Sequence, residues 1–206
     1  MSKIKFKSVR FKNFISVGNM WMEYQLNQLG ASGIIGSNGS GKSLLLDALC
    51  FSLYGKSYRK CNKPNLINSV NEKESVVEIE FDTMNRSYKV VRGQKPNIFE
   101  IYQDGVLLNQ DSKAKDYQLF LENSILKMNF KSFTQIIVLG ASNYTPFMEL
   151  SAADRREVIE DLLDIQIFSN MREKLKEYQK DNNHILAEYD SKISSVQGKI
   201  DIQRII

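Results

Sequence analysis

The sequence predicts an α/β fold built around a glycine-rich loop, with β-hairpins beside the loop and a long helix at the C-terminal end. Three observations predict this class. A short apolar strand runs through a glycine-rich turn into an apolar helix, alternating segments follow in pairs, and the last ~55 residues contain no proline. We expect two parts, a lobe over residues 1–150 and a helical stem over residues 151–206.

Composition excludes several classes of protein. No apolar run approaches the ~18 residues of a membrane span, and the alternating N-terminal residues lack the pattern of a signal peptide. We therefore expect a cytoplasmic protein without membrane contact. Two cysteines and one histidine, His184 in the helical stem, argue against a disulfide framework, a histidine-based triad and a HExxH metal site.

The charge is concentrated at one end of the chain. Residues 1–63 hold ten Lys or Arg and two acids, a net +8, whereas residues 64–206 hold eighteen against twenty-two, a net −4. A basic N-terminal third suits a polyanion ligand. Lysines on the solvated face of an edge strand explain the same pattern, and charge alone does not separate the two explanations.

The N-terminal elements follow from apolar periodicity. Apolar side chains change parity between Phe6 and Val9, which predicts either a bulge near Lys7 and Ser8 or a break into two strands there. Further strands are expected over residues 21–26 and 33–35, the second leading directly into the glycine-rich turn. The helix over residues 42–54 is apolar nearly all round and is predicted to be buried, with Gly55 ending it.

The middle of the chain predicts two hairpins. Residues 76–81 and 88–92 alternate on either side of a short turn, and residues 98–103 and 106–108 flank Asp104-Gly105, a strong two-residue hairpin signal. A helix is expected over residues 112–126, followed by a buried strand over residues 135–139.

The stem begins with a capping pattern, since Ser151 can cap a helix in which Asp154 is the third residue. A single helix of ~55 residues is expected, ~80 Å long. Its apolar or semi-apolar positions recur at steps of three and four, which is typical of a coiled coil with one stutter. The positions are Leu175, Tyr178, Asn182, Ile185, Tyr189, Ile193, Val196 and Ile200. The alternative is an amphipathic helix packed on the lobe.

The glycine-rich turn matches the phosphate-binding pattern G-x-x-x-x-G-K-[ST] at every fixed position, with the required strand before it and helix after it. Its glycines let backbone N–H groups surround a phosphate at the helix N-terminus. Lys42 would contact the β- and γ-phosphates, and the Ser43 hydroxyl would ligate Mg²⁺. The candidate ATP-binding residues are Gly36, Ser37, Asn38, Gly39, Ser40, Gly41, Lys42, Ser43 and Leu44.

The interior of this loop resembles that of SMC-like ATPases, and in particular the SbcC family of DNA double-strand-break repair ATPases. Residues 9–16 resemble the first strand and turn of that family, which makes Lys12 and Asn13 further candidates for nucleotide contact. Residues 133–163 resemble the segment in which SbcC proteins pass from head to coiled coil. The match is closest to the large subunits of tailed-phage recombination endonucleases.

The resemblance implies an ABC-type half-lobe with ATP and Mg²⁺ as cofactors. One departure concerns the glutamine that helps to hold Mg²⁺ in most SbcC-like heads, because Ala141 stands at its position. Asn143 is the first candidate to replace it as a metal contact, and Gln135 is the second.

Several parts of an ABC-type site are missing from the sequence. No acidic pair follows four apolar residues, no Ser-Gly-Gly loop occurs, and the chain has no switch histidine. No catalytic residue is therefore assigned to this chain, because a phosphate-binding loop supplies no general base. By resemblance these parts lie in a C-terminal lobe of the same ATPase, and a second head would close a homodimer over ATP.

The remaining expected partners are a metallophosphoesterase-type nuclease and double-stranded DNA. Residues around Arg155, Arg156 and Phe168 are the candidate nuclease contact, although Ile165, Ile167 and Phe168 suit intrahelical packing equally well. A basic loop follows the buried helix and suits the nucleotide base, DNA phosphates or solvent; it carries Lys56, Arg59, Lys60 and Lys63.

Three other functions remain open at this point. The first is an SMC- or RecF-like clamp or loader without a nuclease, and the second is a coiled-coil scaffold that binds nucleotide only as a structural ligand. The third, a small-molecule kinase, fits less well because a long uncapped helix does not replace its lid.

Overall fold

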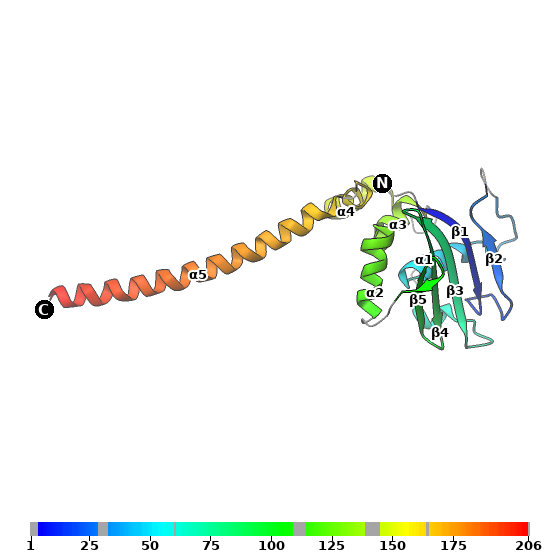
Figure 1. The fold of residues 1–206 in the computed structure, drawn as a ribbon, viewed down its shortest axis with the longest axis horizontal. Coiled ribbons are helices and arrows are strands. Elements are labelled where there is room, and N and C mark those ends of the chain that lie inside the picture. Colours follow the sequence, from blue (N-terminus) through cyan, green and yellow to red (C-terminus); the bar gives the residue numbers. More distant parts are fainter. Residues whose placement is uncertain are drawn as a thin grey trace. The chain divides into compact units, whose positions relative to one another are not determined.

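The structure is a computed structural model that describes residues 4–28, 33–59, 61–108, 114–138, 145–163 and 165–205 (Figure 1). Contacts divide the chain into two compact units, Met1–Leu163 and Asp164–Ile206. The first unit contains a β-sheet and the helices that pack against it. The second unit is formed by one long helix.

One six-stranded sheet organises the first unit, in the order β2-β1-β3-β4-β5-β6, and every pairing in it is antiparallel. Its strands are β1 (Lys5–Lys12), β2 (Met22–Gln25), β3 (Ser75–Thr83), β4 (Arg86–Gln94), β5 (Ile98–Gln103) and β6 (Val106–Leu107). The pairing of β1 with β3 shifts register between Phe6 and Ser8, which confirms the predicted bulge.

Both predicted hairpins are present. The turn between β3 and β4 holds Met84 and Asn85 at φ 52° and 59°, and the turn between β5 and β6 holds Asp104 and Gly105 at φ 51° and 83°. Two consecutive residues with positive φ form a turn whose twist matches that of the flanking strands. Local turn residues therefore set the pairing of these strands.

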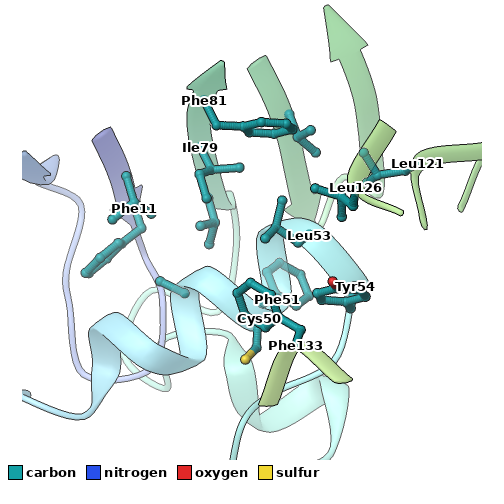
Figure 2. Close-up of a cluster of buried hydrophobic side chains, with 14 of the residues drawn as sticks. Phe11, Cys50, Phe51, Leu53, Tyr54, Ile79, Phe81, Leu121, Leu126 and Phe133 are labelled. Atoms are coloured by element: carbon teal, nitrogen blue, oxygen red, sulfur yellow. The ribbon is translucent and has the colours of Figure 1, made fainter. Parts of the chain in front are cut away.

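Helix α1 (Leu44–Tyr54) follows the glycine-rich loop and packs against β1, β3 and β4. Figure 2 shows Phe51 and Leu53 of this helix in one buried cluster with Ile79 and Phe81 of the sheet. The helix ends at Gly55, which has φ 65° and whose N–H donates to the Phe51 carbonyl at 2.8 Å. The predicted buried helix is thus confirmed.

The helices that follow β6 in the chain differ from the prediction in one place. The helix expected over residues 112–126 is confirmed for its described part as α2 (Ala114–Phe120), which continues as the π-helix η2 (Leu121–Leu126). The strand expected over residues 135–139 is wrong for its described part, because residues 135–136 belong to α3 (Phe130–Ile136) and residues 137–138 form no strand.

The cause of this difference lies at the start of α3. The Asn129 side chain caps the helix by accepting the Ser132 N–H at 2.9 Å. One helical face then buries Phe133 against Phe6 and Tyr54. A cap and a buried aromatic outweigh the apolar run that favoured a strand.

The short strand predicted over residues 33–35 is also absent. Ile35 is 99% exposed, and these residues pair with no strand of the described sheet, whose edges are β2 and β6. A strand needs a neighbour for its N–H and C=O groups. Without one, this segment runs as an irregular connection into the loop.

Arg92 of β4 ties the sheet to α1 and α2. Its Nε donates to the Ser52 carbonyl at 3.0 Å, its Nη2 donates to Gln118 Oε1 at 2.6 Å, and its guanidinium lies 3.8 Å from the centre of the Phe99 ring. Burial lowers the pKa of the Arg92 guanidinium to about 9. The charge also complements the C-terminal end of α1.

The stem starts as predicted and then departs from the prediction. After the short helices η1 (Lys63–Leu66) and η3 (Phe147–Glu149), α4 (Ala152–Leu163) begins at a cap in which the Asp154 N–H donates to Ser151 Oγ at 3.1 Å. One continuous helix is wrong, because α4 ends at Leu163, Ile165 is not helical and α5 (Gln166–Ile205) begins after it. Ile165 is neither proline nor glycine, so the residue type gives no signal for the interruption.

Candidate nucleotide-binding site

The glycine-rich loop curls immediately before α1. Gly39 and Gly41 have φ 83° and 92°, a region that residues with a side chain rarely adopt. The Ser40 N–H donates to the Ser37 carbonyl at 3.2 Å, and the Leu44 N–H donates to the Gly41 carbonyl at 2.9 Å. These bonds bring the loop directly onto the first turn of the helix.

Lys42 and Ser43 follow this turn. The Lys42 Nζ donates to the carbonyls of Gly36 and Ser37 at 2.6 and 2.7 Å, so its ammonium group spans the loop. Ser43 is exposed at the N-terminal end of α1, and its side chain makes no capping hydrogen bond. A hydroxyl in this position is available as an oxygen ligand for Mg²⁺. The side chain of Leu44, in contrast, is buried in the core.

The loop forms one side of an open pocket of about 370 Å³. Ile15 and Ser16, from the turn after β1, and Arg59, from the segment after α1, form the other sides. The pocket thus combines two cationic side chains, those of Lys42 and Arg59, with a helix N-terminus and exposed loop backbone, which is the chemistry that binds a polyphosphate. None of the described residues that line it is an acid.

Arg59 is held beside the pocket by a buried carboxylate. The Asp47 side chain is 0% exposed, and its Oδ2 accepts from Arg59 Nε and Nη2, each at 2.6 Å. Its Oδ1 accepts the Arg59 backbone N–H at 3.1 Å. Arg59 thus lines the pocket, and whether it contacts a nucleotide, DNA or only solvent stays a prediction. Asp47, the only acid in the apolar helix, is the sequence signal that could have predicted this pair.

The other members of the basic loop lie elsewhere. The Lys56 ammonium group lies 5.3 Å from the centre of the Phe130 ring, and Lys63 is exposed. Lys60 lies outside the described residues. Arg59 is thus the only residue of this loop that lines the pocket within the described structure.

Lys12 and Asn13 do not line the pocket. The Lys12 Nζ lies 3.8 Å from Glu74 Oε2 and 5.5 Å from the centre of the Trp21 ring. Asn13 is buried, and its amide is bonded to Asn19, Asn71 and the Glu74 carbonyl. The Asn13 side chain therefore connects the turn after β1 to the segment that contains Asn71 and Glu74.

The candidates for a second metal contact are not brought to the pocket. Asn143 lies outside the described residues. Gln135 lies in α3, and its buried Oε1 accepts no hydrogen bond within the described structure. No group of three metal-ligating His, Cys, Asp or Glu side chains occurs in the part of the chain that the structure describes.

Cys50 is the cysteine nearest in sequence to the loop, and it is buried within α1. Burial, together with the nearby Asp47 carboxylate, raises the pKa of its thiol to about 12. The thiol is therefore protonated at neutral pH. This argues against covalent chemistry at the helix.

Comparison with known proteins places these features in a family. A family model for the AAA domain matches residues 8–201. "Exonuclease subunit 2" of Escherichia phage RB69 is 44% identical over 171 residues, which cover 83% of this chain and 30% of that protein. The SbcC subunit of the nuclease SbcCD from Clostridium acetobutylicum is 29% identical over 160 residues, which cover 71% of this chain and 13% of that protein. These relatives confirm the SbcC-like resemblance.

The fold is also found among solved structures. A chain of the Smc head domain with an extended coiled coil, solved bound to the C-terminal domain of ScpA from Pyrococcus furiosus, matches with a TM-score of 0.59. It is 23% identical, and the match covers 98% of this chain and 52% of that chain. This likeness confirms the predicted fold class. No helix among the described residues is long and apolar enough to cross a membrane.

Proposed function

The chain belongs to the AAA domain family, and from this premise we propose that it is the ATP-binding N-terminal lobe of an SbcC-like ATPase subunit in a DNA recombination and repair nuclease complex. The observation that carries the proposal is the pocket at the start of α1, which Lys42, Ser43 and Arg59 line together. The relatives from phage RB69 and Clostridium acetobutylicum, both named as parts of nucleases, support the nuclease complex.

Each residue of the pocket has a part in binding ATP. Lys42 exchanges its two loop carbonyls for the β- and γ-phosphate oxygens, and the N-terminal end of α1 adds its positive dipole. The Ser43 hydroxyl ligates Mg²⁺, which when bound neutralises phosphate charge. Asn143 is proposed as a second metal contact. Arg59, fixed by Asp47, adds a second positive charge at the side of the pocket.

Hydrolysis needs a carboxylate to activate water, and the described lining residues include none. The chain spans 30% of the length of the exonuclease subunit that it matches. We therefore assign the catalytic acid to a C-terminal lobe of the same ATPase. A second head closes a homodimer over ATP, and hydrolysis reopens it to gate double-stranded DNA toward a metallophosphoesterase-type nuclease in the cytoplasm.

The domain division belongs to the same proposal. Residues 1–150 form the lobe, and residues 151–206 form the root of a coiled coil through which the nuclease docks. Ile167 and Phe168 at the start of α5 are 63% and 66% exposed, which makes them available for such a contact. Arg155 is less available, because its Nη1 donates to the carbonyls of Met148 and Leu150 at 2.9 and 2.8 Å.

The decisive experiment compares Lys42→Ala with Lys73→Ala, an exposed lysine that does not line the pocket. The full chain is titrated with fluorescent N-methylanthraniloyl-ATP and Mg²⁺, and ATP turnover is measured after adding the C-terminal lobe and DNA. We expect Lys42→Ala to lose binding and turnover while Lys73→Ala keeps both. Undiminished turnover in Lys42→Ala would overturn the proposal.

A separate experiment tests the nuclease partner. The ATPase is used to capture a metallophosphoesterase-type nuclease from the same genome, with Phe168→Ser as the variant and Tyr189→Ser, further along α5, as the control. Capture by the control but not by the variant supports docking at the start of α5. ATP turnover without any nuclease complex would favour an SMC- or RecF-like clamp instead.

A further inference from the structure

A tight turn that includes Ile15 and Ser16 lines the pocket together with the glycine-rich loop. The turn approaches the loop closely, since a Cβ atom added to Gly41 would lie 3.9 Å from Ser16 Oγ. The position of this turn therefore determines how much room a ligand has beside Lys42 and Ser43.

Ile15 adopts a conformation that its side chain disfavours. Its φ is 51°, in the left-handed region, where a β-branched residue meets steric conflict with its own backbone. Both of its backbone polar groups are bonded to one neighbouring segment. The Ile15 N–H donates to the Leu66 carbonyl at 3.0 Å, and the Ile15 carbonyl accepts from Asn68 Nδ2 at 3.0 Å.

Asn68 is itself fixed in place. It is 7% exposed, and its Oδ1 accepts the N–H groups of Val70 and Asn71 at 3.0 and 3.1 Å. Its own N–H donates to the Asn13 carbonyl at 2.9 Å. Because two N–H donors point at Oδ1, the amide cannot flip without facing donor against donor, and Nδ2 must point toward Ile15.

We propose that Asn68 is a positioning residue for nucleotide binding, which clamps the strained Ile15–Ser16 turn against the phosphate-binding pocket. The inference rests on the proposed function, because it takes the ligand of the pocket to be ATP. Asn68 does not line the pocket and acts through Ile15, which does. Loss of the clamp lets Ile15 return to a negative φ and moves the wall away from the ligand.

The test exchanges the side-chain NH₂ group of Asn68 for an oxygen. Asn68→Asp keeps an oxygen for the N–H groups of Val70 and Asn71 but loses the donor to Ile15. Asn65→Asp, an exposed position on the same segment, introduces the same charge as a control. We expect Asn68→Asp to raise the Kd for N-methylanthraniloyl-ATP by roughly three- to tenfold, the effect of one net hydrogen bond, while the control binds like the wild type.

A double-mutant cycle separates positioning from general stability. Glycine adopts positive φ without steric conflict, so in an Ile15→Gly background the Asn68→Asp change is expected to alter the Kd by less than about twofold. Either of two results would overturn the clamp. One is that Asn68→Asp raises the Kd equally in both backgrounds, and the other is that the Asn68→Asp single variant binds nucleotide as the wild type does. If circular dichroism shows that Asn68→Asp does not fold, Asn68→Ser takes its place in the cycle.

Amide hydrogen exchange tests the clamp without nucleotide. The peptide that contains residues 14–17 is expected to exchange faster in Asn68→Asp than in Asn65→Asp, and equal exchange contradicts the inference. The two proposals fail differently. A wild-type chain that binds no ATP refutes the proposed function alone, whereas wild-type binding and unchanged exchange in Asn68→Asp refute the clamp alone.

Discussion

Arg59→Ala is expected to destabilise the first unit more than Asp47→Ala does, although the two side chains form one ion pair. The Asp47 side chain is 0% exposed and that of Arg59 is 40% exposed. Removing the guanidinium leaves a buried carboxylate with the backbone N–H of residue 59 as its remaining donor from this segment. Removing the carboxylate leaves a guanidinium that can turn into water.

The magnitudes follow from this asymmetry. Stranding a buried charge costs about 3–5 kcal/mol, and the retained charge-assisted bond offsets about 1.5 kcal/mol of it. We expect Arg59→Ala to lower the free energy of unfolding by about 2–3 kcal/mol. Asp47→Ala loses an ion pair of which only the Arg59 side chain is partly exposed, and it is expected to lower the free energy of unfolding by about 1–2 kcal/mol. The double variant is expected to match Asp47→Ala, because no charge is then stranded.

Urea unfolding followed by the fluorescence of Trp21 measures these values. Trp21 is the only tryptophan of the chain and lies beside β2, with the Arg10 guanidinium 4.8 Å from the centre of its ring, so it reports on the first unit alone. Arg86→Ala, at an exposed arginine of β4, serves as the control. Equal losses in the two single variants, or a greater loss in Asp47→Ala, would refute the reasoning.

Three further changes test other parts of the fold. Gly41→Ala forces a side chain into φ 92° and is expected to cost about 1–3 kcal/mol and weaken ATP binding; unchanged melting and binding contradict this. Ser151→Ala removes the cap of α4 and is expected to lower the free energy of unfolding in urea by about 1 kcal/mol; an unchanged free energy of unfolding contradicts this. Burial raises the pKa of Asp161, so the folded protein favours the protonated carboxyl. The contribution of this carboxyl to the free energy of unfolding is therefore present below pH ~4 and is lost as the pH rises. Asp161→Asn is therefore expected to be at least as stable as the wild type at pH 7, with no advantage near pH 4, and a less stable variant at pH 7 argues against this sign.

Features set by neighbouring residues could be predicted from the sequence. Asp104-Gly105 specifies a turn with two positive φ values, Gly55 ends α1, and Ser151 caps α4. Each of these depends on bonds within four residues. The glycine-rich loop is also local, since its match to a phosphate-binding motif lies within residues 36–43 and α1 follows it directly, although the strand expected before it is absent.

Features set by distant partners could not be predicted in the same way. Ile35 and residues 135–139 belong to apolar runs that suit a strand, but a strand forms only where a neighbour supplies its hydrogen bonds. In this chain the run ending at Ile35 pairs with no strand of the sheet, and the cap at Asn129 and the burial of Phe133 favour α3, which takes up residues 135–136 of the second run. The pairing of Asp47 with Arg59 spans 12 positions, and that of Asn68 with Ile15 spans 53.

Each of these two long-range pairs holds one residue that lines the pocket beside the glycine-rich loop. Contacts within this chain therefore form part of the pocket's walls. Asp47 and Asn68 are both buried, neither lines the pocket, and each fixes one residue that does. Under the proposed function, the glycine-rich loop provides the phosphate contacts, whereas the width and charge of the pocket depend on side chains that do not line it. We therefore expect nucleotide affinity and hydrolysis to be separable in this lobe. Variants of Asn68 are expected to change the affinity for nucleotide, whereas turnover is expected to require a carboxylate that the described lining of the pocket does not contain.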